Sequence, residues 1–182
     1  MCASLLFYTF DMKYIICFLF FITVAIDSSA QTIRQRYSSR LTQDGICYFF
    51  RKVELSKLEN IDKFVYDMTY LDWNDSVAIN FTIHSSIPNA PKVTNIKSGE
   101  NSFICDKTER YFVDVTNNGY IIRSSAKYHK NDLDKIVFSK DKPIFCFQLG
   151  NTEASATYSD SAWKKDSKKL QSILNLIYSL KQ

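Results

Sequence analysis

The chain has 182 residues, of which 46% are apolar and 23% are charged, and its formal net charge is +4. This composition is typical of a globular protein and excludes wholesale disorder. With only four glycines, each beside a turn-forming residue, the chain has no glycine-rich phosphate-binding loop. The net charge is mild and no basic stripe is present, so we expect no nucleic-acid partner.

The N-terminal part of the chain has the pattern of a secretory signal peptide. Lys13 precedes an apolar run over residues 14–26, which is shorter than the roughly 20 residues that span a bilayer. Small residues at Ser28 and Ala30 predict cleavage after Ala30, so residues 1–30 are a predicted signal peptide, with Met12 as an alternative start. We expect an exported protein, periplasmic or extracellular, without a stable membrane anchor after cleavage. An uncleaved N-terminal anchor is the alternative.

Cleavage at this site leaves three cysteines, Cys47, Cys105 and Cys146, in an oxidising compartment. One interpretation is a single disulfide, with Cys105 and Cys146 as the candidate pair, and the other is three buried thiols. No Cys-x-x-Cys motif occurs, so neither a zinc ribbon nor thioredoxin chemistry is expected. Because only two histidines, His84 and His129, are present and both are predicted at the surface, we expect no metal and no cofactor.

The rest of the chain predicts a single domain rich in strands. Residues 31–43 are polar and predict a flexible N-terminal arm, and residues 44–182 predict one α+β domain. Aromatic and β-branched residues predict a strand over residues 46–55. Residues 56–63 stay open between a loop and a short helical turn, since apolar residues recur there every third position.

Two hairpins are predicted from turn chemistry between β-rich runs. Residues 64–71 and 76–84 flank an Asp-Trp-Asn-Asp turn, and the second run alternates between apolar and polar positions, which indicates a half-buried antiparallel strand. Asn118-Gly119 separates two further β-rich runs, and Asn-Gly is a strong hairpin signal. Shorter strands are predicted over residues 93–96, 102–105, 144–149 and 154–158.

The C-terminal segment predicts an amphipathic helix. Its apolar residues share one helical stripe, namely Trp163, Leu170, Ile173, Leu174 and Ile177. The lysine cluster Lys164, Lys165, Lys168 and Lys169 is interpreted as a solvated face, with contact to an acidic partner or an anionic surface as the alternative. A shorter helix is predicted over residues 132–138. The predicted class is α+β: a mostly antiparallel sheet or sandwich of six to eight strands with a C-terminal amphipathic helix.

Few residues are candidates for a functional site. Trp73, at the tip of the first hairpin, is the main candidate for binding, with Tyr70 and Asp67 in the preceding strand as companions. Glycoside hydrolysis needs only two carboxylates, so Asp67 with Asp72 or Asp114 is the alternative, catalytic hypothesis. No other catalytic motif is present in the sequence.

Several segments resemble small uncharacterised exported proteins of Bacteroidetes-type bacteria. They are the leader from Lys13 to Gln31, residues 64–70 and 75–82, the run from Gly119 to Arg123, and Trp163-Lys164-Lys165. The resemblance implies no activity. It does imply that Asp75-Ser76-Val77 and Asp160-Ser161-Ala162 are O-glycosylation motifs of those bacteria.

These observations together predict an exported, non-enzymatic binding protein whose partner is a protein or a glycan. A small carboxylate-dependent hydrolase is one alternative function. An immunity or inhibitor protein for a secreted toxin is the other.

Overall fold

The computed structural model describes residues 35–86 and 92–180 of the chain. The predicted signal peptide and the start of the predicted arm lie outside these residues. The chain from Tyr37 onward forms one compact unit. Within the described residues, no helix combines the length and the hydropathy required to cross a membrane.

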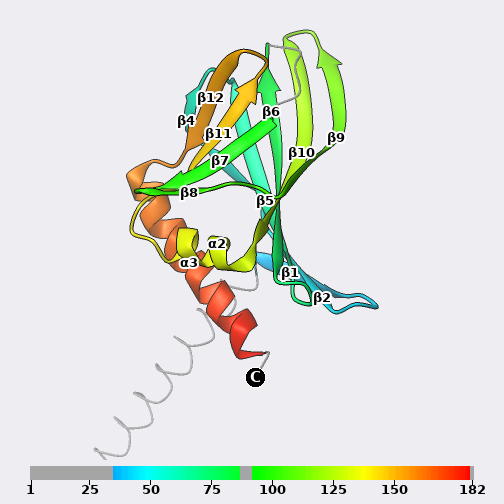
Figure 1. The fold of residues 1–182 in the computed structure, drawn as a ribbon, viewed down its shortest axis with the longest axis vertical. Helices are drawn as coiled ribbons and strands as arrows, with labels where there is room; N and C mark the ends of the chain where they lie inside the picture. The colour runs from blue at the N-terminus through cyan, green and yellow to red at the C-terminus, as the bar shows by residue number, and fades with distance from the viewer. Residues whose placement is uncertain (1–34, 87–91, 181–182) are drawn as a thin grey trace, which may run out of the picture. The chain divides into compact units, whose positions relative to one another are not determined.

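Two antiparallel sheets and two helices make up this unit (Figure 1). Sheet A consists of β1 (Tyr37–Leu41), β2 (Ile46–Phe50), β3 (Val53–Leu55), β5 (Lys63–Leu71), β6 (Ser76–Ser85), β9 (Lys107–Thr116) and β10 (Gly119–His129). Sheet B consists of β4 (Lys57–Glu59), β7 (Lys92–Ser98), β8 (Asn101–Phe103), β11 (Ile144–Leu149) and β12 (Thr152–Thr157). The helices are α2 (Lys130–Val137) and α3 (Asp160–Ser179). The predicted α+β class, mostly antiparallel and with a longer C-terminal helix, is confirmed.

The order of strands in sheet A is β1-β2-β5-β6-β10-β9, with β3 also pairing β5, and in sheet B it is β4-β12-β11-β7-β8. The described strands outnumber the six to eight predicted, in part because β3, β4 and β8 have only three residues each. Such short strands form because neighbouring backbones pair, as Leu58 of β4 does with Ala156 of β12. Their length is too small for an alternation signal in the sequence.

β1 lies in the segment that was predicted to be a flexible arm. Its five residues pair with β2 in regular antiparallel register. The backbone N–H and the hydroxyl of Thr42 both donate to the carbonyl of Gly45, at 2.8 Å each, and close the turn between the two strands. All but the first of the β1 side chains are exposed, so the strand is held by its backbone and carries no apolar pattern.

An aromatic cluster joins the two sheets across the core. β5 and β6 alternate between buried and half-buried positions, and their buried side chains face sheet B. The ring of Phe64 lies 5.3 Å from that of Phe145 and 5.1 Å from that of Phe147, centroid to centroid. Tyr66 lies 5.0 Å from Phe145, and Phe81 lies 5.6 Å from Phe147. Aromatic pairs at these distances add to the free energy gained from burial alone.

The C-terminal helix α3 packs through the predicted apolar stripe. The hydroxyl of Ser159 accepts a hydrogen bond from the N–H of Ala162 at 3.3 Å and caps the first turn. Trp163, Ile173, Leu174 and Ile177 are buried. The ring of Trp163 lies 5.1 Å from that of Tyr158, which anchors the start of the helix on the end of β12.

Two buried hydroxyls in this core satisfy each other. Tyr66 of β5 and Tyr158 form a hydrogen bond through their side-chain oxygens. Burial raises the pKa of both tyrosines above its ordinary value, so both hydroxyls remain protonated at neutral pH. Each therefore depends on the other for its hydrogen bond.

Truncation of Phe64 is expected to destabilise the fold severely. Phe64→Ala should lower the free energy of unfolding by about 3–5 kcal/mol, because the cavity would open between the two sheets. Phe112→Ala, at a ring that is 41% exposed, should change it by less than about 1 kcal/mol. Urea denaturation followed by circular dichroism measures both, and equal losses would contradict the central place of Phe64.

The tyrosine pair yields a second prediction. Tyr158→Phe should cost about 1–3 kcal/mol, because it leaves the Tyr66 hydroxyl buried without a partner. The double variant Tyr66→Phe/Tyr158→Phe should lie within about 1 kcal/mol of the wild type, since both polar groups are removed together. Chemical denaturation of the three proteins forms the comparison, and a double variant less stable than the single one would refute the coupling.

Candidate functional site

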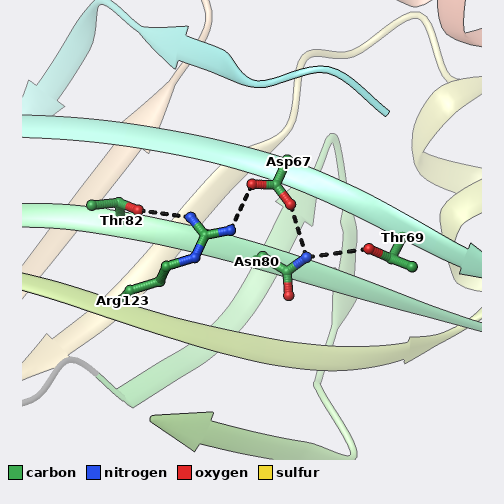
Figure 2. Close-up of polar contacts among 5 residues, drawn as sticks. All are labelled: Asp67, Thr69, Asn80, Thr82 and Arg123. Carbon is green, nitrogen blue, oxygen red and sulfur yellow. Dashed lines mark hydrogen bonds and ion pairs between the residues drawn. The ribbon is translucent and has the colours of Figure 1, made fainter. Parts of the chain in front are cut away.

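A polar network lies on the face of sheet A that is turned away from the core (Figure 2). Residues that pair across strands share a face, and Asp67 pairs with Asn80 while Thr82 pairs with Arg123. Arg123 donates to the Asp67 carboxylate and to the Thr82 hydroxyl, at 2.9 Å each. Asn80 donates to Asp67 at 2.8 Å and to Thr69 at 3.3 Å.

This network is self-contained. The side chains of Asp67 and Arg123 are only 14% and 23% exposed, and both carboxylate oxygens of Asp67 already accept a charge-assisted or amide hydrogen bond. The contacts run across β5, β6 and β10 and tie the register of three strands. The arrangement therefore stabilises the sheet and engages both carboxylate oxygens of Asp67.

The structure does not bring together the carboxylates of the catalytic hypothesis. β9 is the third strand from β5, so Asp114 lies at least about 14 Å from Asp67 at ordinary strand spacing. Asp72 is five residues beyond Asp67, about 16 Å along the strand direction, and its carboxylate accepts from the N–H of Ile46 at 2.9 Å. Glycoside hydrolysis requires carboxyl groups about 5–10 Å apart, which neither pair meets.

The three binding candidates from the sequence do not share a surface. Tyr70 is fully buried on the core face of β5, opposite to Asp67, and its ring stacks on Tyr48 at 6.0 Å. Trp73 lies in the turn after β5 and is 38% exposed. It packs against Gly45, where an added Cβ would stand 2.8 Å from the indole Cε3. Side chains two residues apart in a strand share a face, so Tyr70 lies on the same face as Phe64 and Tyr66. This alternation in the sequence assigns Tyr70 to the core.

Cys105 and Cys146 are thiols in the structure, so their predicted disulfide stays a prediction. The sulfur of Cys105 lies 3.4 Å from the hydroxyl of Thr108. Burial raises the pKa of the Cys146 thiol, which disfavours the reactive thiolate. In the described part of the chain, no three His, Cys, Asp or Glu side chains are grouped so as to hold a metal ion.

The two serines in the resembled O-glycosylation motifs differ in accessibility. Ser161 is exposed at the start of α3. Ser76 is buried, and its hydroxyl donates to the side-chain oxygen of Asn74 at 2.5 Å. Only the motif at Ser161 presents its hydroxyl to solvent.

The edge strand β9 stands out as a surface that the sequence did not single out. Ten residues long, it pairs with β10 alone among the strands of the described residues, and nine of its side chains are exposed. Tyr111, Phe112, Val113 and Val115 are 55%, 41%, 36% and 78% exposed. The other edge strands, β1, β3, β4 and β8, have at most five residues. The sequence does carry one signal for this surface. A half-buried strand alternates between apolar and polar residues, and the run from Arg110 to Val115 does not.

Breaking the charge pair of the polar network is expected to cost stability. Arg123→Met should lower the free energy of unfolding by about 2 kcal/mol, because Asp67 keeps its charge in a poorly hydrated position without its partner. Lys63→Met, which breaks the more exposed pair with Glu54 on the same sheet, should cost less than about 1 kcal/mol. Thermal or urea unfolding measures both, and equal effects would show that the Arg123 pair behaves like a surface pair.

Comparison with known proteins adds no relative to this description. No family model matches the chain, and no curated protein or solved structure matches it either. The functional conclusion therefore depends on the surfaces described above.

Proposed function

We propose that this chain is an exported, non-enzymatic binding protein that adds an extended segment of a partner polypeptide to the free edge of β9. The observation that carries the proposal is the ten-residue edge strand with four exposed large apolar side chains. Lys13 and the apolar run after it support export.

The backbone of β9 is the first part of the argument. An edge strand presents unpaired N–H and C=O groups, and a further strand can pair with them. Proteins usually blunt such edges with short strands, prolines or lysines. Sheet A does so at β1, which has five residues and a polar sequence. The first half of β9 also carries such features, namely Lys107 and the register shift at Tyr111, whereas residues 112–116 contain neither proline nor lysine.

Side chains define which segment of β9 is available. A register shift at Tyr111 divides the ladder with β10 into two regular stretches, residues 107–110 and 112–116, and the second carries Phe112, Val113 and Val115. By their pairing with β10, Phe112 and Asp114 lie on the outer face of the sheet, and Val113 and Val115 lie on the other face. Side chains on both faces of this stretch are exposed.

Charge defines the partner further. The carboxylate of Asp114 has no ion pair among the described residues. A partner strand that places a basic residue opposite Asp114 and β-branched residues opposite the two valines would pair on both faces. We therefore propose an extended, β-branched partner segment with a central lysine or arginine.

A polypeptide is favoured over a glycan for two reasons. The polar groups that would bind sugar hydroxyls are engaged with one another in the Asp67–Arg123 network. The exposed indole of Trp73 is partly covered by the turn at Gly45. The carboxylate separations described above do not favour the hydrolase.

A lysine on the β9 edge is expected to weaken binding. Val115→Lys should weaken the binding of ten-residue β-branched peptides with a central lysine by at least about tenfold, because an edge lysine must be desolvated when a strand is added. Leu41→Lys is the matched control, since Leu41 is also 78% exposed and lies on the opposite edge of the same sheet. A peptide array probed with the full-length protein, followed by titration of the best binder, measures the effect.

Hydrogen exchange locates the contact. Binding should protect the amides of residues 112–116 and leave those of β1 unchanged. Peptides with a central glutamate should bind more weakly than those with a central lysine. Equal losses in Val115→Lys and Leu41→Lys, or glycan binding that survives Val115→Lys, would overturn the proposal.

A further inference from the structure

A cleft of about 700 Å³ lies between the first half of α3 and the segment that follows α2. Figure 1 shows the two helices close to each other. This volume falls within the range of small-molecule sites. The residues that line it are Gly99, Phe138, Ser139, Lys140, Asp141, Lys142, Ile144, Asp160, Trp163, Lys164, Ser167, Lys168 and Gln171.

One face of α3 forms a wall of the cleft. The α3 residues that line it are three or four positions apart, which places them on the same side of the helix. Trp163 and Ser167 are buried at its base, and Lys164 and Lys168 are exposed at its rim. Lys165 does not line the cleft. Of the lysine cluster predicted as a solvated face, Lys164 and Lys168 therefore line the cleft, and the other two lysines do not.

Hydrogen bonds hold the opposite wall. The side-chain amide of Gln171 donates to the carbonyl of Val137 at 2.8 Å, near one end of the cleft. Lys142 donates to the Asp160 carboxylate at 2.6 Å, near the start of α3. The hydroxyl of Ser98 donates to the carbonyl of Asp141 at 3.1 Å. The cleft is therefore built from fixed elements on both sides.

Some of the charged groups that line the cleft form ion pairs and others do not. Lys142 is neutralised by Asp160, whose pKa the lysine lowers through a hydrogen bond and its charge. The ammonium groups of Lys140, Lys164 and Lys168 form no ion pair with any residue in the described ranges.

Two further polar groups line the cleft, the hydroxyl of Ser167 and the indole N–H of Trp163. Ser167 is 8% exposed, and its hydroxyl makes no hydrogen bond within the described chain. The cleft thus holds three ammonium groups, a hydroxyl and the indole N–H of Trp163 without an acceptor, against one carboxylate, that of Asp141, outside any ion pair of the described residues. Phe138, 46% exposed, and the buried indole of Trp163 contribute apolar surface to the same space.

We propose that this cleft binds a small organic anion: a carboxylate, sulfonate or phosphate group that carries an aromatic or aliphatic body. The anionic group pairs with the ammonium groups of Lys140, Lys164 and Lys168, and the body packs against Phe138 and the base of the cleft. A small ligand is favoured over an acidic protein surface because the space has the volume of a small-molecule site and Trp163 and Ser167 are buried beneath it. The site is separate from the β9 edge, so either proposal can fail alone.

The test uses two dyes that differ in one charge. 8-Anilinonaphthalene-1-sulfonate is the anionic probe, and N-phenyl-1-naphthylamine is its neutral counterpart. With the full-length protein, we expect the dissociation constant of the anionic dye to be at least about tenfold lower, because charge-assisted hydrogen bonds add to the apolar contact. Lys164→Ala/Lys168→Ala should raise that constant by about tenfold and leave the neutral dye unaffected.

The control variant removes the same charge elsewhere. Lys135→Ala/Lys165→Ala takes away two exposed lysines that do not line the cleft, and it should leave the affinity for both dyes unchanged. The two tryptophans give separate indole N–H resonances in a nitrogen–proton correlation spectrum. The anionic dye should shift that of Trp163 and leave that of Trp73 in place, and the spectrum also confirms that each variant is folded.

Three results would overturn the proposal. One is equal affinity for the two dyes. Another is an equal loss in both lysine double variants, which would indicate attraction by net charge alone. The last is a hexaglutamate peptide that shifts the Trp163 resonance when the dye does not, since this would assign the cleft to an acidic polypeptide.

Discussion

The contact of Phe64 with Phe145 and Phe147 is the interaction on which the other features depend. These three rings join the centre of sheet A to the centre of sheet B at 5.1–5.3 Å between centroids. Because the two sheets share no backbone hydrogen bonds, burial of such side chains is what holds them together. Because β5 packs on β11 through these rings, the face of sheet A that carries Phe64 is the core face, and the face that carries Asp67 is the outer one.

Much of this core could be predicted from the sequence, because alternation and turn chemistry are local signals. The hairpin around residues 72–75 and the Asn-Gly hairpin before Tyr120 are predicted by such patterns and are present in the structure. β1 could not be predicted, since its exposed polar side chains carry no pattern and only its backbone pairing makes it a strand. The lining of the helix cleft is equally out of reach, because Gly99, Phe138 and Trp163 meet only through tertiary packing.

Exposed polar groups are satisfied within the fold at some surfaces and left without partners at others. On the outer face of sheet A, Asp67, Asn80 and Arg123 satisfy one another, so that face is polar without being available. At β9 and at the cleft beside α3, by contrast, backbone groups or charges lack partners among the described residues. Unmatched groups of this kind are a better guide to binding than polarity alone, because a ligand adds interactions there that the fold has not already made.

The exposure of β9 also has a consequence for the time course of folding. β9 and β10 are joined by a tight turn, where the hydroxyl of Thr116 donates to the carbonyl of Gly119, and a local hairpin of this kind forms within about 1–10 μs. The packing of sheet A on sheet B requires contacts between residues far apart in the chain, which form more slowly. A strand edge with unpaired backbone N–H and C=O groups is therefore present before the core has formed. Newly made chains that are still folding would associate with one another through this edge at high local concentration, which sets an upper limit on the rate at which the protein can be produced without aggregation.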